Sequence, residues 1–196
     1  MKESVPVRKS TRSKNIDYSK PGAYFVTICT RNRKDMLSRI ENDCMHCCNE
    51  VESRALEAGA ASYSPTIDKG FSANFPKLFL TEIGKIAERQ LLAACERFSN
   101  VRIDEYVIMP NHIHIIIFID GHEEGFVHGL NDVIRVFKST ASRECKAKYQ
   151  IDGLFQRSYY DHLIKDKADY TKIVRYIREN PKTWFYDRYY RKYYQT

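Results

Sequence analysis

The chain has 196 residues, of which 43% are hydrophobic and 29% are charged, and its net charge is +7. This length suits one domain, or one domain with an insertion, and allows a sizeable core. No run of about 18 apolar residues occurs, so no membrane span is expected. The N-terminus is basic but has no apolar core, which excludes a typical secretory signal, so we expect a cytoplasmic location. The pI of about 9.0 favours a polyanionic partner.

The first predicted element is a strand at Tyr24–Arg31 (YFVTICTR), which is rich in aromatic and β-branched residues. From about residue 41 to 75 the periodic pattern is lost, and this stretch is interpreted as an insertion of loop and short helix. Within it, Cys44, Cys47 and Cys48 form the one cysteine cluster of the chain. A zinc site needs four ligands and no second CxxC follows, so a cluster of free thiols is favoured over zinc.

The next segments predict a pairing of strands and then a helix. Lys77–Leu80 is expected to pair with the segment around Met36–Ile40. The apolar positions of Thr81–Phe98 have helical spacing, and Thr81 is a suitable N-cap residue. Two strands, Arg102–Met109 and His112–Ile119, then follow, joined by a tight Pro-Asn turn.

The last predicted elements are a helix, a strand and a further helix. An amphipathic helix is expected at Asn131–Tyr149, a strand at Leu154–Lys165, and a helix at Asp169–Asn180 that Asp169 caps and Pro181 ends. The order β, α, β, β, α, β is that of an α+β protein with a ferredoxin-like split βαβ fold. In this fold two helices lie on one face of an antiparallel sheet, and here a C-terminal helix follows.

The strand His112–Ile119 (HIHIIIFI) carries two histidines in an apolar sequence. Side chains alternate along a strand, so His112 and His114 share one face and the isoleucines at odd positions share the other. The isoleucine face should meet the helices. With a rise of about 3.3 Å per residue, the two imidazoles are close enough to bind one divalent ion. The alternative is a pair of half-exposed histidines beside the turn, because an HxH pattern often occurs by chance.

A metal site needs a further ligand, and the final predicted helix offers one. Tyr176 and Asn180 are four residues apart and therefore share a helix face. An Asn oxygen suits Mg²⁺ or Mn²⁺ beside imidazoles, and a tyrosine hydroxyl can act as a nucleophile. From spacing alone, Asn180 could equally be a helix-ending residue and Tyr176 a core residue.

The motifs "MPNHIHIII" and "FQRSYYDHLIKDKADYTKIVRYIRENP", with "DYSKPGAYFVTICTRNR" near the start, resemble the REP-associated tyrosine transposases. These are single-tyrosine members of the HUH nuclease superfamily. The resemblance implies a single domain over residues 1–196, with an insertion at about 41–75 and a basic aromatic tail at 182–196. It implies that His112, His114 and Asn180 hold Mg²⁺ or Mn²⁺ and that Tyr176 is the nucleophile.

The resemblance further implies that the protein nicks and rejoins single-stranded hairpin DNA through a 5′-phosphotyrosine intermediate. We expect a monomer or homodimer without a membrane partner. Basic residues in several parts of the chain are expected to contact DNA phosphates: Arg8, Lys9, Arg12, Arg135, Lys138, Arg157, Lys165 and Lys172.

Two other functions compete with this interpretation. One is a domesticated relative that binds DNA hairpins without cutting them. The other is a ferredoxin-like RNA-binding protein, which would carry stacking aromatic residues on the sheet where this chain has histidines. The tail at 182–196 has three possible roles: to stack on bases, to cover the active face, or to pack on the open side of the sheet.

Overall fold

The computed structural model describes residues 20–41, 76–121 and 128–190. The strands are β1 (Gly22–Cys29), β2 (Ser38–Glu41), β3 (Lys77–Leu80), β4 (Val101–Ile108), β5 (His112–Ile119) and β6 (Tyr160–Leu163). The helices are η1 (Arg31–Arg33), α2 (Glu82–Glu96), α3 (Leu130–Tyr149), α4 (Lys167–Glu179) and η2 (Trp184–Tyr186).

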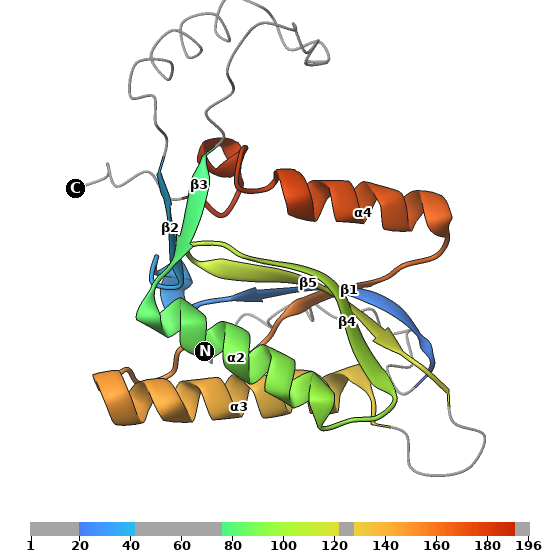
Figure 1. Ribbon diagram of the computed structural model, residues 1–196, viewed down its shortest axis with the longest axis horizontal. Helices are drawn as coiled ribbons and strands as arrows, with labels where there is room; N and C mark the ends of the chain where they lie inside the picture. Colours follow the sequence, from blue (N-terminus) through green and yellow to red (C-terminus); the bar gives the residue numbers. More distant parts are fainter. Residues whose placement is uncertain (1–19, 42–75, 122–127, 191–196) are drawn as a thin grey trace, which may run out of the picture.

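A four-stranded antiparallel sheet with the order β4-β5-β1-β6 forms the centre of the protein. Helices α2 and α3 cover one face of this sheet, and α4 lies across the other (Figure 1). A separate two-stranded sheet, β2-β3, stands beside it. This arrangement confirms the predicted ferredoxin-like fold with its additional C-terminal helix.

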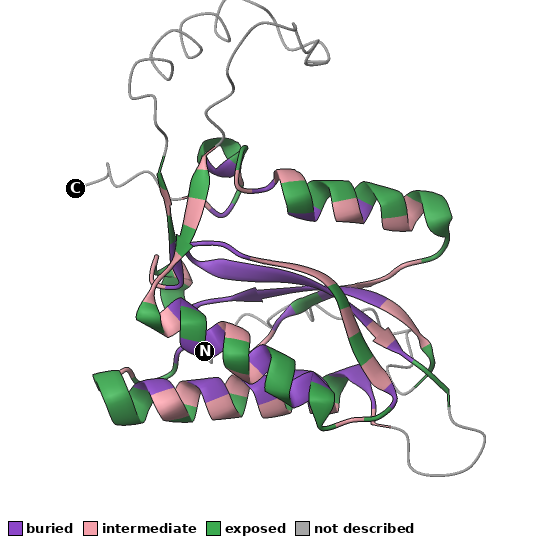
Figure 2. Ribbon diagram, in the orientation of Figure 1, coloured by how far each residue is buried: buried purple, intermediate pink, exposed green. Residues whose placement is uncertain are grey.

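The two faces of β5 pack against different layers. Ile113, Ile115 and Ile117 belong to the main core with residues of α2 and α3, as the alternation predicts. On the other face, Ile116 packs with Ile173 and Ile177 of α4. Burial on both faces leaves nearly all of β5 buried, and its ribbon is largely purple in Figure 2.

The turns around α2 follow the prediction. Strand β3 pairs with β2, and the Thr81 hydroxyl accepts a hydrogen bond of 3.0 Å from the Gly84 amide as the N-cap of α2. The same hydroxyl also contacts the carbonyl oxygens of Met36 and Leu37 at 2.6 and 3.0 Å. The N-terminus of α2 is therefore fixed to the segment that leads into β2.

The predicted start of the last helix was wrong. Helix α4 begins at Lys167, and its N-cap is Asp166, whose side chain accepts from the Asp169 amide at 2.8 Å. Asp169 lies in the first turn, where its carboxylate accepts from the Lys165 amide at 3.1 Å and contacts His162 Nε2 at 2.8 Å. Asp166 and Asp169 are both suitable N-cap residues, and the helix uses Asp166, the one closer to β6.

The strand predicted at Leu154–Lys165 is shorter than expected. Only Tyr160–Leu163 pairs with β1, whereas Phe155 forms an isolated bridge with Thr30. Leu154 and Phe155 instead bury their side chains in the main core. Between Phe155 and Tyr160 the regular pairing is interrupted after Gln156, whose amide donates to the Cys29 carbonyl, and residues of this stretch line clefts at the edge of the sheet.

Glu144 of α3 connects the two helices on the core side of the sheet. Its carboxylate accepts from Gln90 Nε2 at 2.8 Å and forms ion pairs with Arg89 and Lys148. The hydrogen bonds from Lys148, Arg89 and Gln90 lower the pKa of Glu144 to about 2.

Glu144→Gln should therefore lower the free energy of unfolding near neutral pH by about 1 kcal/mol, the upper end of the range for exposed ion pairs. Because the folded pKa lies below the ordinary value of 4.5, this contribution is present above about pH 4.5 and disappears as the pH falls toward 2. Urea unfolding across this pH range measures the effect. Glu96→Gln, at the exposed end of α2, is the control, and an equal loss in both variants would contradict the role of Glu144.

Within the described residues, no helix is long and apolar enough to cross a membrane. Several predicted features lie outside the described residues: the cysteine cluster, nearly all of the insertion, the end of the tail, and the three N-terminal basic residues Arg8, Lys9 and Arg12.

Candidate active site

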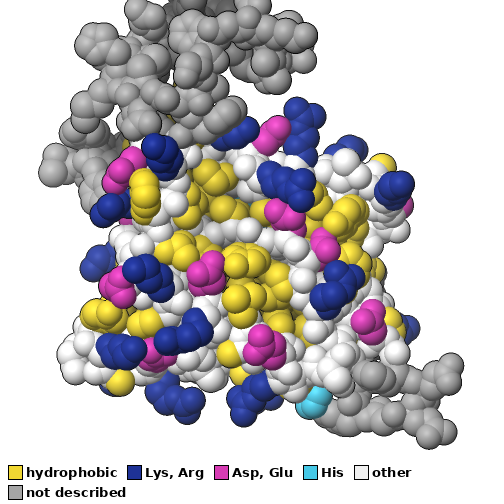
Figure 3. Space-filling model, in the orientation of Figure 1, with side chains coloured by type: hydrophobic (Ala, Val, Ile, Leu, Met, Phe, Trp, Pro, Cys, Tyr) yellow, Lys and Arg dark blue, Asp and Glu magenta, His cyan; other side chains and the backbone are white. Residues whose placement is uncertain are grey.

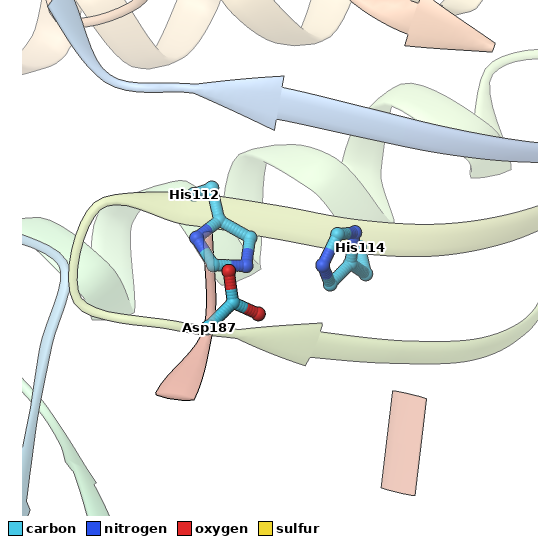
Figure 4. Close-up of side chains that lie close together, drawn as sticks. All are labelled: His112, His114 and Asp187. Carbon is cyan, nitrogen blue, oxygen red and sulfur yellow. The ribbon is translucent and has the colours of Figure 1, made fainter. Parts of the chain in front are cut away.

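His112 and His114 project from one side of β5, and Asp187 directs its carboxylate toward the His112 ring (Figure 4). Both histidines are fully buried, with ring centroids 4.4 Å apart. They lie on the sheet face opposite α2 and α3, as the alternation predicts. They are not half-exposed, because α4 and the segment around Trp184 and Tyr189 cover them.

A hydrogen-bond network fixes the orientation of His112. Its Nδ1 lies 2.9 Å from Asn111 Oδ1, and Asn111 Nδ2 donates to the carbonyl oxygens of Tyr189 at 2.9 Å and Arg33 at 3.4 Å. Because the amide nitrogen faces two carbonyl acceptors, Oδ1 is the atom that faces the imidazole and must accept from Nδ1–H. His112 Nε2 is then left with a free lone pair, as a metal ligand requires.

His114 is held by an equivalent contact and touches the candidate nucleophile. Its Nδ1 lies 2.9 Å from the Thr27 hydroxyl, on the neighbouring strand β1. Its Nε2 lies 3.2 Å from the Tyr176 hydroxyl. The structure therefore brings together a residue of β5 and a residue of α4 that the sequence analysis had assigned to one site.

Burial keeps both imidazoles neutral. It lowers the pKa of His112 to about 4, although the negative charge of Asp187 acts in the opposite direction. The pKa of His114 is held well below its ordinary value, first by burial and then by the proximity of His112. Neutral imidazoles have lone pairs to offer a metal ion.

Asn180 and Asp187 complete this cluster. Asn180 is buried at the C-cap of α4, and its Nδ2 donates to Asp187 Oδ2 at 3.0 Å. Ligand atoms of His112, His114 and Asp187 lie within 4.8 Å of one another. Sequence analysis selected Asn180 and missed Asp187, which follows η2 in the tail and has no spacing relationship to the histidines.

Two buried acceptor atoms in this cluster have no hydrogen-bond donor among the described residues: His112 Nε2 and Asn180 Oδ1. Leaving buried acceptors unsatisfied is costly, and a cation supplies what they lack. Imidazole nitrogens, an amide oxygen and a carboxylate are suitable ligands for Mg²⁺ or Mn²⁺. The donor set therefore fits the divalent ion that the sequence analysis expected.

Tyr176 lies at the wall of an open cleft. The residue is 39% exposed, which excludes the alternative of a core residue. The cleft has a volume of about 610 Å³, and Asp187, Arg188, Tyr160 and Tyr186 also line it. Burial raises the pKa of Tyr176 to about 12, with Asp187 adding to the effect. The hydroxyl therefore stays protonated near neutral pH unless a positive charge is brought close to it.

The predicted DNA-contacting residues that the structure describes lie in two regions. Arg135, Lys138 and Arg157 line one cleft of about 550 Å³ beside α3. Lys138 donates to the carbonyl oxygens of Gln156 and Arg157. Lys165, just before α4, and Lys172, within it, are both exposed. None of the five belongs to the histidine cluster.

Basic side chains are also present elsewhere, but they are mixed with acidic ones. On the face seen in Figure 3, lysine and arginine side chains are interspersed with aspartate and glutamate. Several are paired, as Arg102 is with Asp104 and Arg178 with Glu105. The net positive charge therefore does not by itself select a DNA-binding surface.

Comparison with known proteins identifies two relatives of this chain. A Haemophilus influenzae protein named "Uncharacterized protein" is 27% identical over 200 residues, which cover 93% of each chain. A second protein of that organism, named "Putative REP-associated tyrosine transposase", is 26% identical over 132 residues, covering 59% of this chain and 73% of that protein.

A solved structure of a REP-associated tyrosine transposase bound to a REP hairpin has a similar fold, with a TM-score of 0.52 and 16% identity. The match covers 87% of this chain and 72% of that one. The resemblance inferred from the motifs is thus confirmed. The family model described as "Transposase IS200 like" matches residues 77–180, which include β5 and α4 up to Asn180. The chain belongs to the IS200-like transposase family.

Proposed function

We propose that this protein is a divalent-metal-dependent transposase that nicks and rejoins single-stranded hairpin DNA, with Tyr176 as the nucleophile. The observation that carries the proposal is the contact of 3.2 Å between the Tyr176 hydroxyl and His114 Nε2, beside the unpartnered His112 Nε2. Membership of the IS200-like transposases and the hairpin bound by the structural relative support the choice of substrate.

The chain's own residues prepare the site in defined ways. Asn111 and Thr27 hold the two imidazoles in place, and burial keeps them neutral. His112, His114, Asn180 and Asp187 would hold the ion. A bound Mg²⁺ or Mn²⁺ would supply positive charge to polarise the scissile phosphate and to favour deprotonation of a nearby hydroxyl.

The Tyr176 oxygen attacks phosphorus, and the bond between phosphorus and the 3′ oxygen breaks. This forms a 5′-phosphotyrosine, while the 3′ oxygen leaves and takes up a proton as a 3′-hydroxyl. Attack by a 3′-hydroxyl in the reverse direction rejoins a strand and returns the proton to Tyr176. One phosphodiester is exchanged for another, so no external energy source is required.

Tyr176→Phe should abolish the covalent protein–DNA adduct, because phenylalanine has no oxygen with which to attack phosphorus. The measurement is denaturing electrophoresis after incubation with Mg²⁺ or Mn²⁺ and labelled hairpin DNA from inverted repeats that flank the gene. Tyr170→Phe is the matched control, because it makes the same change on the same helix and removes only a hydroxyl that contacts Asp104.

An adduct that persists in Tyr176→Phe would overturn the assignment of the nucleophile. Tight hairpin binding by the unaltered protein, without an adduct in either metal, would instead favour the domesticated DNA-binding protein. Stronger binding of RNA than of hairpin DNA would favour the RNA-binding function.

A further inference from the structure

A second cleft, of about 480 Å³, adjoins the Tyr176 cleft. Tyr160 and Arg188 line both, so the two clefts meet at these side chains. Thr27, which holds His114, also lines the second cleft. The remaining lining residues include two polar side chains, Gln156 and Ser158, from the irregular segment before β6. We call this second space the arginine cleft.

The arginine cleft is positively charged. Arg33 and Arg188 both line it, and no aspartate or glutamate does. Within the described residues neither arginine forms an ion pair, whereas Arg175 on the outside of α4 is paired with Glu179. Neither guanidinium group therefore has a carboxylate within ion-pair distance in the described part of the chain, although, against the opposing effect of burial, the charge of Asp187 helps to raise the pKa of Arg188.

A tight turn holds Arg33 in place. Asn32 and Arg33 have φ angles of 58° and 53°, in the left-handed region that residues other than glycine seldom adopt. Such a conformation persists only where the surroundings enforce it. Here the Thr30 hydroxyl donates to the Lys34 carbonyl at 2.8 Å, and Asn111 Nδ2 donates to the Arg33 carbonyl. Asn111 also orients His112, so one amide connects Arg33 to the histidine cluster.

One aromatic ring contacts both arginines. The guanidinium carbons of Arg33 and Arg188 lie 4.9 and 4.8 Å from the centroid of the Tyr189 ring. Arg188 Nη2 also donates to the Tyr189 hydroxyl at 2.9 Å. Tyr189 itself is buried against His112, with ring centroids 4.5 Å apart. The buried Tyr189 ring thus holds both guanidinium groups close to the histidines.

We propose that the arginine cleft binds the phosphate backbone of the DNA single strand adjoining the scissile phosphate, with Arg33 and Arg188 as the phosphate ligands. Guanidinium groups without carboxylate partners are well suited to phosphate oxygens. Tyr160, which is 44% exposed where the two clefts meet, provides a ring on which a base can stack. This inference rests on the proposed function and identifies how its single-stranded substrate is held.

The test measures binding rather than cleavage, in full-length protein carrying Tyr176→Phe. The probe is fluorescent oligothymidylate, since binding to the phosphate backbone requires no particular base sequence. Each phosphate contact on a single strand contributes about 0.7 to the slope of log K against log salt concentration. Arg33→Ala and Arg188→Ala should each reduce the slope by about 0.7, and the double variant by about 1.4.

Arg31→Ala is the matched control, because Arg31 belongs to the same turn but does not line the cleft. It should leave the slope unchanged. Arg33→Lys should retain most of the slope, which distinguishes a phosphate contact from mere packing against Tyr189. Thymidine monophosphate should compete weakly, because it offers only one phosphate.

Three results would each overturn the inference. These are an unchanged slope in both Arg33→Ala and Arg188→Ala, an equal reduction in Arg31→Ala, or complete competition by thymidine monophosphate at the same phosphate concentration. Because these measurements need no cleavage, the two proposals can fail separately. The expected slopes without a Tyr176 adduct would support phosphate binding in the arginine cleft and contradict the proposed function. A Tyr176 adduct with unchanged slopes would support the proposed function and contradict phosphate binding in the arginine cleft.

Discussion

His112→Ala should lower the affinity of the protein for Mn²⁺ by more than about 100-fold and abolish the covalent adduct with DNA. Loss of a residue that only orients a metal ligand typically costs 10–100-fold in affinity, so loss of a ligand itself should exceed that range. His112 Nε2 is one of the two buried acceptors in the cluster that no described donor satisfies. Isothermal titration with Mn²⁺ measures the affinity without requiring DNA.

Two further variants give this experiment its controls. His128→Ala removes a histidine that lies before α3, away from the cluster, and should leave Mn²⁺ binding unchanged. Asn111→Ala removes the acceptor of His112 Nδ1–H and should reduce Mn²⁺ affinity by about 10–100-fold. Unchanged Mn²⁺ binding in His112→Ala would show that the cluster is not the metal site.

The histidine pair was predictable because strand alternation is a local rule. A run of isoleucines at every second position leaves the intervening histidines on the opposite face, and the observed packing of Ile113 and Ile115 follows that rule. The shared helix face of Tyr176 and Asn180 was predictable for a similar reason, since four residues make slightly more than one helical turn. Their identification as one site with the histidines needed the family resemblance, because β5 and α4 meet only through tertiary packing.

Asp187 could not be predicted in the same way. Its position depends on Asn180 ending α4, on the short helix η2, and on the burial of Trp184 and Tyr189 against the sheet. None of these is a periodic feature of the sequence. The aromatic character of the tail was nevertheless a signal: buried rings in the described part of the tail cover the histidine face, one of the three roles considered. Arg33 was missed for a comparable reason, because its placement follows from a left-handed turn.

The edge of the sheet shows where local reasoning fails. The sequence from Leu154 to Lys165 has the composition of one strand, yet its pairing is interrupted between the bridge at Phe155 and the start of β6. Leu154 and Phe155 are buried in the core and still pair, but Phe155 faces Thr30 whereas Tyr160 faces Thr27, so the register shifts by two residues between the two parts. The irregular segment between the two paired parts, which no local sequence rule predicts, supplies Gln156 and Ser158 to the arginine cleft.

Gly84→Ala should destabilise the protein by about 3 kcal/mol or more, although alanine is the better helix former. Helix propensity alone would stabilise α2 by about 0.8–1.0 kcal/mol. However, a Cβ atom at Gly84 would lie 1.9 Å from the Leu37 carbonyl oxygen, so backbone must move. The two effects have opposite signs, so urea unfolding decides between them. Gly22→Ala is the control, since the atom nearest its new Cβ would be the movable end of Leu163, at 3.0 Å, and the Tyr24 ring would be at ordinary contact distance.

Gly84→Ala should also weaken metal binding, because the segment around Leu37 that it displaces supports the metal site. The amides of Met36 and Leu37 both donate to the Pro110 carbonyl, at 2.8 and 2.9 Å, immediately before the Asn111 that orients His112. At temperatures where Gly84→Ala is still folded, its Mn²⁺ affinity should therefore fall as well, whereas that of Gly22→Ala should not. A stabilised Gly84→Ala with unchanged Mn²⁺ binding would show that α2 does not hold the turn before β5 in place.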